Sequence, residues 1–124
     1  MIRLTKIILV QFYLFDAEEL EIRGHTAILG PNGSGKSSLL DAIQIAMMGA
    51  NGNYLRFNAQ TPGRRRSDRN IRDYCLGAIR NGESENAPTD RKRDHATSYI
   101  TLVFRDDASD RVVSAGVCLS ASVE

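Results

Sequence analysis

The chain has 124 residues, the length of one domain, because independent domains usually contain about 100–200 residues. Hydrophobic residues make up 42% and charged residues 25%, a globular composition that excludes a disordered or collagen-like chain. Apolar runs fall well short of the roughly 18 residues of a membrane-spanning helix, and the N-terminal run is too short for a signal-peptide core. The two cysteines, Cys75 and Cys118, predict neither a disulfide framework nor a metal site, and we expect them to be small apolar residues in a reduced, cytoplasmic protein.

The charges are segregated along the chain, although the net charge is only +1. Residues 56–80 contain seven arginines and two aspartates, a local charge of +5, whereas the segments before and after them carry −1 and −3. Such a block favours a polyanion such as nucleic acid or nucleotide phosphate. From charge alone, a solvated loop is an equally good interpretation.

The first part of the chain has the pattern of strands. Residues 2–15 are rich in apolar and aromatic side chains and predict one or two strands. The polar residues 16–19 predict a turn, and the alternation over residues 20–24 predicts a half-buried strand. A short apolar run over residues 25–29 then leads into a glycine-rich segment. Its glycines can adopt backbone conformations that a Cβ would forbid, so the segment predicts a tight turn.

A helix is predicted from Lys36, with its end at Gly49 or at the following Asn51-Gly52 pair. Its apolar residues fall at helical spacing and predict one buried stripe, formed by Leu39, Leu40, Ile43, Ala46 and Met47.

The second half of the chain predicts a short helix, a loop and a hairpin. Ser67 is a candidate N-cap for a helix that ends near Leu76, and residues 81–95 are polar and predict an exposed loop. Residues 96–104 and 111–119 alternate around the acidic segment 106–110, which predicts an antiparallel hairpin. Together these elements predict an α/β fold with a mixed sheet, one long helix and this hairpin.

The motif that carries chemistry is Gly30-Pro31-Asn32-Gly33-Ser34-Gly35-Lys36-Ser37, which matches the P-loop pattern G-x-x-x-x-G-K-[ST]. Its main-chain N–H groups can surround a β-phosphate, and the helix that follows directs its positive end at the same group. Lys36 is the catalytic candidate because its ammonium can reach the β- and γ-phosphates, Ser37 can ligate Mg²⁺, and Ser38 can contact the α-phosphate. The residues predicted to bind ATP are Pro31, Asn32, Gly33, Ser34, Gly35, Lys36, Ser37 and Ser38.

Hydrolysis also requires an acidic residue at a strand end that holds Mg²⁺ and a group that positions the attacking water. Asp106 and Asp107 follow a predicted strand, but we interpret them as turn aspartates of the hairpin. The chemistry on this chain is therefore expected to be incomplete.

The strand residues 4–12 and the segment from Ile28 to Ile43, with Asp41-Ala42-Ile43 after the P-loop, resemble the N-terminal lobe of an SMC-type, ABC-like ATPase head. Residues 54–58 and 69–77 are more similar to the bacterial MukB/MksB/JetC branch, which includes the Wadjet anti-plasmid systems. The resemblance implies that residues 1–124 are the N-terminal part of a head, without its coiled coil and C-terminal lobe. The signature motif, Walker B acid, Q-loop and catalytic glutamate would then lie outside this chain.

The resemblance also implies ATP and Mg²⁺ as cofactors, and an ATPase that works as a full-length dimer, with the isolated fragment inactive. It implies four partners: DNA, the C-terminal half of the same head, a second head across sandwiched ATP, and a kleisin-like subunit, at the nucleoid and not at a membrane. In this family a loop after the first helix senses DNA or nucleotide, and Arg64, Arg65, Arg66 and Arg69 occupy that region.

The expected function is therefore an ATP-dependent DNA-organising machine for chromosome segregation, condensation or plasmid defence. The alternatives are a DNA-repair ATPase of the SbcC or RecN type and the nucleotide-binding domain of a transporter. A P-loop scaffold that binds partners without nucleotide is disfavoured by the intact Lys36 and Ser37.

Overall fold

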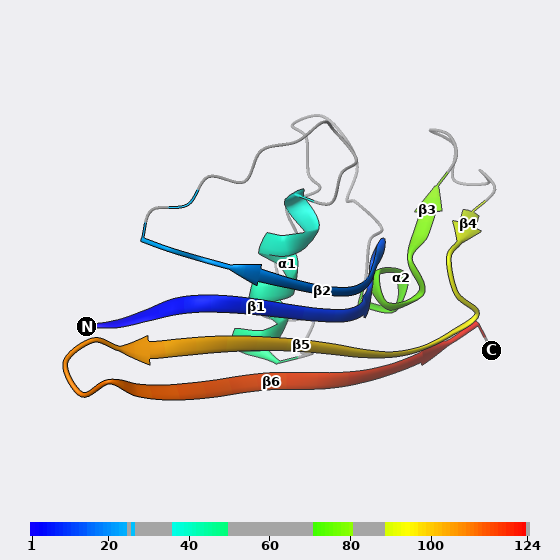
Figure 1. Ribbon diagram of the computed structural model, residues 1–124. Coiled ribbons are helices and arrows are strands. Elements are labelled where there is room, and N and C mark those ends of the chain that lie inside the picture. Colours follow the sequence, from blue (N-terminus) through cyan, green and yellow to red (C-terminus); the bar gives the residue numbers. More distant parts are fainter. Residues whose placement is uncertain (25, 27–35, 50–70, 81–88, 124) are drawn as a thin grey trace.

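The computed structural model describes residues 1–24, 26, 36–49, 71–80 and 89–123. The main sheet has four strands. Figure 1 shows these strands side by side, with a long helix against one face of the sheet. The short second helix lies near one end of the strands. Among the described residues, the helices are too short or too polar to cross a membrane.

The main sheet has the order β2-β1-β5-β6. Its strands are β1 (Ile2–Phe12), β2 (Phe15–Glu21), β5 (His95–Asp106) and β6 (Arg111–Ser122). Each neighbouring pair is antiparallel, so the described part of the sheet contains no parallel pair. The α/β class predicted from the sequence is confirmed, and the run at residues 27–29, which would have made the sheet mixed, lies outside the described residues.

The predicted turn at residues 16–19 is wrong, because these residues form most of the edge strand β2. Glu18 pairs with Leu9 and Glu19 with Ile8, and the chain reverses at residues 13–14 instead. An edge strand exposes many of its side chains to water, so acidic residues can occupy it. Lys6 Nζ lies 2.6 Å from Glu19 Oε1 across the two strands, and this hydrogen bond and charge raise the pKa of Lys6.

The β5–β6 hairpin is confirmed, and its two strands pair over their full length from His95↔Ser122 to Asp106↔Arg111. Asp106 accepts hydrogen bonds from the Ala108 N–H at 3.1 Å and the Ser109 hydroxyl at 2.9 Å. These donors hold the pKa of Asp106 below its usual value. Asp107 pairs with Arg3 at 3.0 Å, so both aspartates serve the turn, as the sequence predicted.

Helix α1 (Lys36–Met48) covers the inner face of the sheet. Leu39, Ala42 and Ile45 are buried in a core that also contains Ile7, Leu9, Ile100 and Leu102. The predicted stripe is therefore partly wrong, since Leu40 is 49% exposed and Met47 62% exposed. Gly49 ends the helix with a positive φ of 76°, and its N–H donates to the Ile45 carbonyl oxygen at 2.8 Å.

The second helix, α2 (Ile71–Leu76), ends at Leu76, as predicted, and Gly77 follows it with a positive φ, whereas Ser67 lies outside the described residues. The predicted loop over residues 81–95 is wrong in part, because β4 (Thr89–Arg91) pairs with β3 (Ala78–Arg80) and β5 begins at His95. Cys75 on α2 is buried, as expected. Cys118 is exposed instead, opposite Tyr99 on the outer face of the hairpin.

Candidate nucleotide site

The structure places only part of the predicted site. Residues 31–35 and the four arginines of the predicted sensing region, Arg64, Arg65, Arg66 and Arg69, lie outside the described residues. Lys36 and Ser37 form the first positions of α1, but their side chains are also outside the described part. Ser38 is the first predicted site residue whose side chain the structure describes, and it is 1% exposed.

Helix α1 begins at Lys36, so its N-terminus includes the last two residues of the P-loop motif. Its first main-chain N–H groups have no partners within the helix, and the helix dipole makes this end positive. Many helices place an acidic residue in the first turn to offset that charge, but α1 has none there. An anionic ligand at this end would therefore meet no carboxylate of the first turn.

Ser38 provides a test of whether this end fits a nucleotide phosphate. Its Oγ is a buried side-chain atom that lacks a hydrogen-bond partner within the described part of the chain. A buried hydroxyl without a partner costs about 1–3 kcal/mol, and buried polar groups in native proteins are nearly always satisfied. A phosphate oxygen would accept a hydrogen bond from the Ser38 hydroxyl and remove that cost, so the residue fits the group that the motif predicts.

One contact beside the site was not predicted. The Tyr74 hydroxyl of α2 donates a short hydrogen bond to Oδ2 of Asp41, one turn beyond Ser38 on α1. Both residues are buried, and they are 33 positions apart in the sequence. In the sequence, Asp41 stands out only as part of the segment Asp41-Ala42-Ile43, which resembles a family pattern, and the sequence carries no signal that pairs it with Tyr74.

Tyr74 is itself held by the β1–β2 hairpin. Its ring stacks on Phe12 with centroids 5.1 Å apart and meets the ring of Tyr13 edge-on at 5.8 Å. The Tyr13 N–H donates to the Tyr74 carbonyl oxygen at 2.5 Å. The ring and main chain of Tyr74 therefore contact the hairpin, and its hydroxyl contacts α1.

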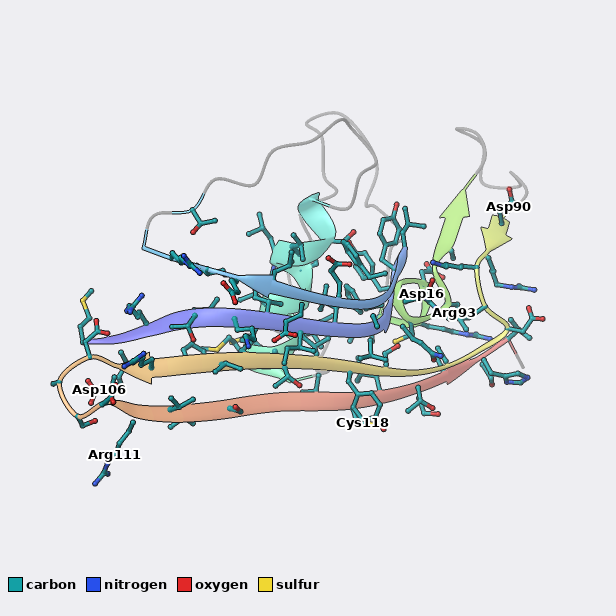
Figure 2. All side chains as sticks on the ribbon, in the orientation of Figure 1. Asp16, Asp90, Arg93, Asp106, Arg111 and Cys118 are labelled. Atoms are coloured by element: carbon teal, nitrogen blue, oxygen red, sulfur yellow. The ribbon has the colours of Figure 1, made fainter. Side chains whose placement is uncertain are left out.

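The described residues contain no group of three or more His, Cys, Asp or Glu side chains that would hold a metal ion by itself. Asp106 lies at the β5–β6 turn, whereas α1 crosses the middle of the sheet (Figure 2). A Mg²⁺ ion at the P-loop would therefore depend on Ser37, on phosphate oxygens and water, and on acids outside the described residues.

Comparison with known proteins gives the same assignment for the first half of the chain. Residues 4–62 match the family model described as the P-loop containing region of an AAA domain. A segment of 59 residues is 46% identical to the chromosome partition protein Smc of Methanocaldococcus jannaschii. That segment covers 47% of this chain but only 5% of the relative, and no solved structure matches the chain. Over residues 4–62 the chain is thus similar to a P-loop-containing region, and a segment of 59 residues is similar to part of an Smc protein.

Proposed function

We propose that the chain binds Mg·ATP at the N-terminus of α1 and forms part of a head that acts on DNA. The observation that carries this proposal is the buried Ser38 Oγ, which has no hydrogen-bond partner among the described residues and lies at a helix end with no acid in its first turn. The match to a P-loop region and to a chromosome partition protein supports it. The proposed role is chromosome segregation, condensation or plasmid defence, in the cytoplasm at the nucleoid.

The chain's own residues would each perform one task. The main chain of residues 30–35 and the first turn of α1 supply N–H donors for phosphate oxygens. Lys36 neutralises charge on the β- and γ-phosphates, Ser37 donates an oxygen to Mg²⁺, and Ser38 donates a hydrogen bond to the α-phosphate. Mg·ATP supplies the phosphoryl group that is transferred to water in the complete head.

A second half of the head is proposed to cover the outer side of α1. Leu40 and Met47 are exposed there, and they lie seven positions apart, so they share one face of the helix. The opposite face packs on the sheet through Leu39 and Ile45. A helix that is apolar on two sides is normally buried on two sides, and the C-terminal half of the same head is the proposed cover.

That C-terminal half would supply the Walker B acid, the Q-loop, the signature motif and the catalytic glutamate. It would be joined to this lobe through a coiled coil. Two such heads would close on ATP, and a kleisin-like subunit would bridge them. This division of labour predicts that residues 1–124 alone hydrolyse ATP negligibly.

Calorimetric titration of the protein that carries this chain with Mg·ATP tests the binding proposal. We expect saturable binding for the unchanged protein and its loss in Lys36→Ala, because the variant lacks the charge that would offset that of the triphosphate. Ser38→Ala should bind about tenfold more weakly, the effect of one lost hydrogen bond to a charged group. Equal heats for the unchanged protein and Lys36→Ala would refute nucleotide binding at this motif.

DNA binding has a separate test in the arginine-rich segment. Alanine at Arg64, Arg65 and Arg66 should lower the slope of log affinity against log salt by roughly one for each lost phosphate contact. Arg111→Ala, at the exposed start of β6, is the matched control and should leave the slope unchanged. An unchanged slope in the triple variant would identify the three arginines as a solvated surface.

A further inference from the structure

We propose that Tyr74 is a positioning residue for the nucleotide site. Its hydroxyl holds Asp41 and thereby sets the rotation of α1 about its own axis, which determines where Ser38 points. The inference rests on the proposed nucleotide-binding function and adds to it a residue far from the P-loop in the sequence.

The geometry of α1 couples the position of Ser38 to that of Asp41. Ser38 and Asp41 are three positions apart, so they lie on the same face of the helix. Both are buried, with exposed fractions of 1% and 0%. A rotation of α1 that moves the Asp41 carboxylate therefore also moves the Ser38 hydroxyl, in the same direction.

Apolar packing and hydrogen bonding constrain the rotation of α1 to different degrees. The apolar residues of this face, Leu39, Ala42 and Ile45, pack on the sheet through contacts that are favourable over a range of angles, because burial of apolar surface is not directional. A hydrogen bond is directional, and it weakens steeply when its angle changes. The Tyr74–Asp41 bond is thus a contact that favours one rotation of the helix over its neighbours.

The donor of this hydrogen bond, the Tyr74 hydroxyl, is held in place by its neighbours. The Tyr74 ring is held between Phe12 and Tyr13, and the Tyr74 carbonyl oxygen accepts hydrogen bonds from the Tyr13 N–H and the Gly77 N–H. The hydroxyl position is therefore set by the β1–β2 hairpin, which belongs to the main sheet. Through Tyr74, the sheet holds the helix that follows the P-loop.

The chemistry of Asp41 also supports a positioning role. A buried carboxylate is costly unless it is hydrogen-bonded, and a leucine or methionine would pack in a core position at lower cost. A carboxylate at 0% exposure is therefore expected to have a role beyond stability. Fixing the rotation of the phosphate-binding helix relative to the sheet is such a role.

The test measures the affinity of the Tyr74→Phe and Asp41→Asn variants for a fluorescent Mg·ATP analogue, in the protein that carries this chain. Tyr74→Phe keeps the ring stacking but removes the donor, and we expect binding to weaken about tenfold. Asp41→Asn keeps an oxygen that accepts the same bond, and it should retain affinity within about twofold to threefold of the unchanged protein. Tyr99→Phe is the matched control, since Tyr99 lies on the outer face of the sheet, and it should not change affinity.

A double variant separates positioning from a merely structural role. If Tyr74 acts through Ser38, then Ser38→Ala weakens binding much less in the Tyr74→Phe background than in the unchanged protein. Thermal unfolding without nucleotide, measured on the same variants, reports stability separately. Full additivity of the two substitutions, or a Tyr74→Phe protein that melts earlier but binds with unchanged affinity, would overturn the inference.

The two proposals fail differently. If the unchanged protein and Lys36→Ala bind the analogue equally, nucleotide binding itself is refuted. If Lys36→Ala abolishes binding while Tyr74→Phe has no effect, nucleotide binding stands and the positioning role of Tyr74 is rejected. If Tyr74→Phe does not fold, the Asp41→Asn variant still tests the inference. A loss of affinity in Asp41→Asn as large as that in Ser38→Ala would reject it, because Asp41→Asn keeps the oxygen that accepts the Tyr74 hydrogen bond.

Discussion

The guanidinium of Arg93 donates a hydrogen bond to the Tyr13 carbonyl oxygen at 3.0 Å, across 80 positions of sequence. The same side chain donates to the carbonyl oxygens of Cys75 at 3.1 Å and Phe15 at 2.7 Å, and it pairs with Asp16 at 3.2 Å. One arginine thus joins the β1–β2 turn, the end of α2 and the start of β5. Figure 2 shows Arg93 and Asp16 close together beside α2, at the opposite end of the sheet from Asp106.

Replacement of this arginine should destabilise the fold. The Arg93 side chain is 9% exposed, and Arg93→Ala would remove donors from three carbonyl oxygens, so we expect a loss of about 3 kcal/mol in the free energy of unfolding. Urea denaturation measures the change. Arg91→Ala is the control: Arg91 pairs only loosely with Asp94 at 3.7 Å, with a side chain that is 43% exposed, and it should change stability by less than about 0.5 kcal/mol. Similar losses in both variants would contradict the role assigned to Arg93.

The two faces of α1 should respond differently to truncation. Ile45 is fully buried against the sheet, so Ile45→Ala should cost about 3 kcal/mol through lost burial and the cavity left behind. Met47 is 62% exposed, and Met47→Ala should cost less than about 0.5 kcal/mol in residues 1–124 alone. Denaturant unfolding of the two variants checks the assignment. A larger loss for Met47→Ala would mean that the stripe predicted from the sequence is the buried one.

This difference also shows what the sequence could predict of α1. The existence and start of the helix follow from the glycine-rich turn and the helical spacing after Lys36. The buried face does not follow, because apolar residues occur on two sides of the helix, at Leu39 and Ile45 and at Leu40 and Met47. Periodicity predicts that a face is buried, but it does not show which of two apolar faces meets a given sheet.

In the strands, the local sequence pattern is sufficient to predict the element where one face is buried and the other is exposed. In β5, Ile100 and Leu102 are buried and alternate with Thr101, so the strand and its hairpin were predictable. The two ends of the edge strand β2 fall in predicted strands, but its residues 16–19 were predicted as a turn because their side chains are exposed on both faces and therefore show no alternation. The Tyr74–Asp41 contact depends on a long-range packing arrangement that no local pattern encodes.

Acid should weaken the β5–β6 turn through Asp106. The Ala108 N–H and then the Ser109 hydroxyl hold the pKa of Asp106 below its unfolded value of about 3.9. Their contribution is therefore complete above the unfolded pKa and is lost as the pH falls through the lower folded pKa. We expect the melting temperature of the unchanged protein to fall more steeply between about pH 5 and pH 2 than that of Asp106→Asn, which does not titrate. Parallel curves for the two proteins would show that these hydrogen bonds do not depend on the charge of Asp106.

Gly77 and Gly49 allow a comparison of backbone strain with steric overlap. Both have positive φ, 65° and 76°, a conformation that an alanine adopts at a cost of about 1 kcal/mol. A Cβ at Gly49 would meet nothing within 4 Å, whereas a Cβ at Gly77 would lie 2.7 Å from the Tyr13 carbonyl oxygen and 2.8 Å from Lys92 Cβ. Gly49→Ala should therefore lose about 1 kcal/mol of unfolding free energy, and Gly77→Ala about 3 kcal/mol or more, because the α2 end must also move away from the β1–β2 turn. Chemical denaturation of both variants measures the difference, and equal losses would show that the turn yields without cost at Gly77.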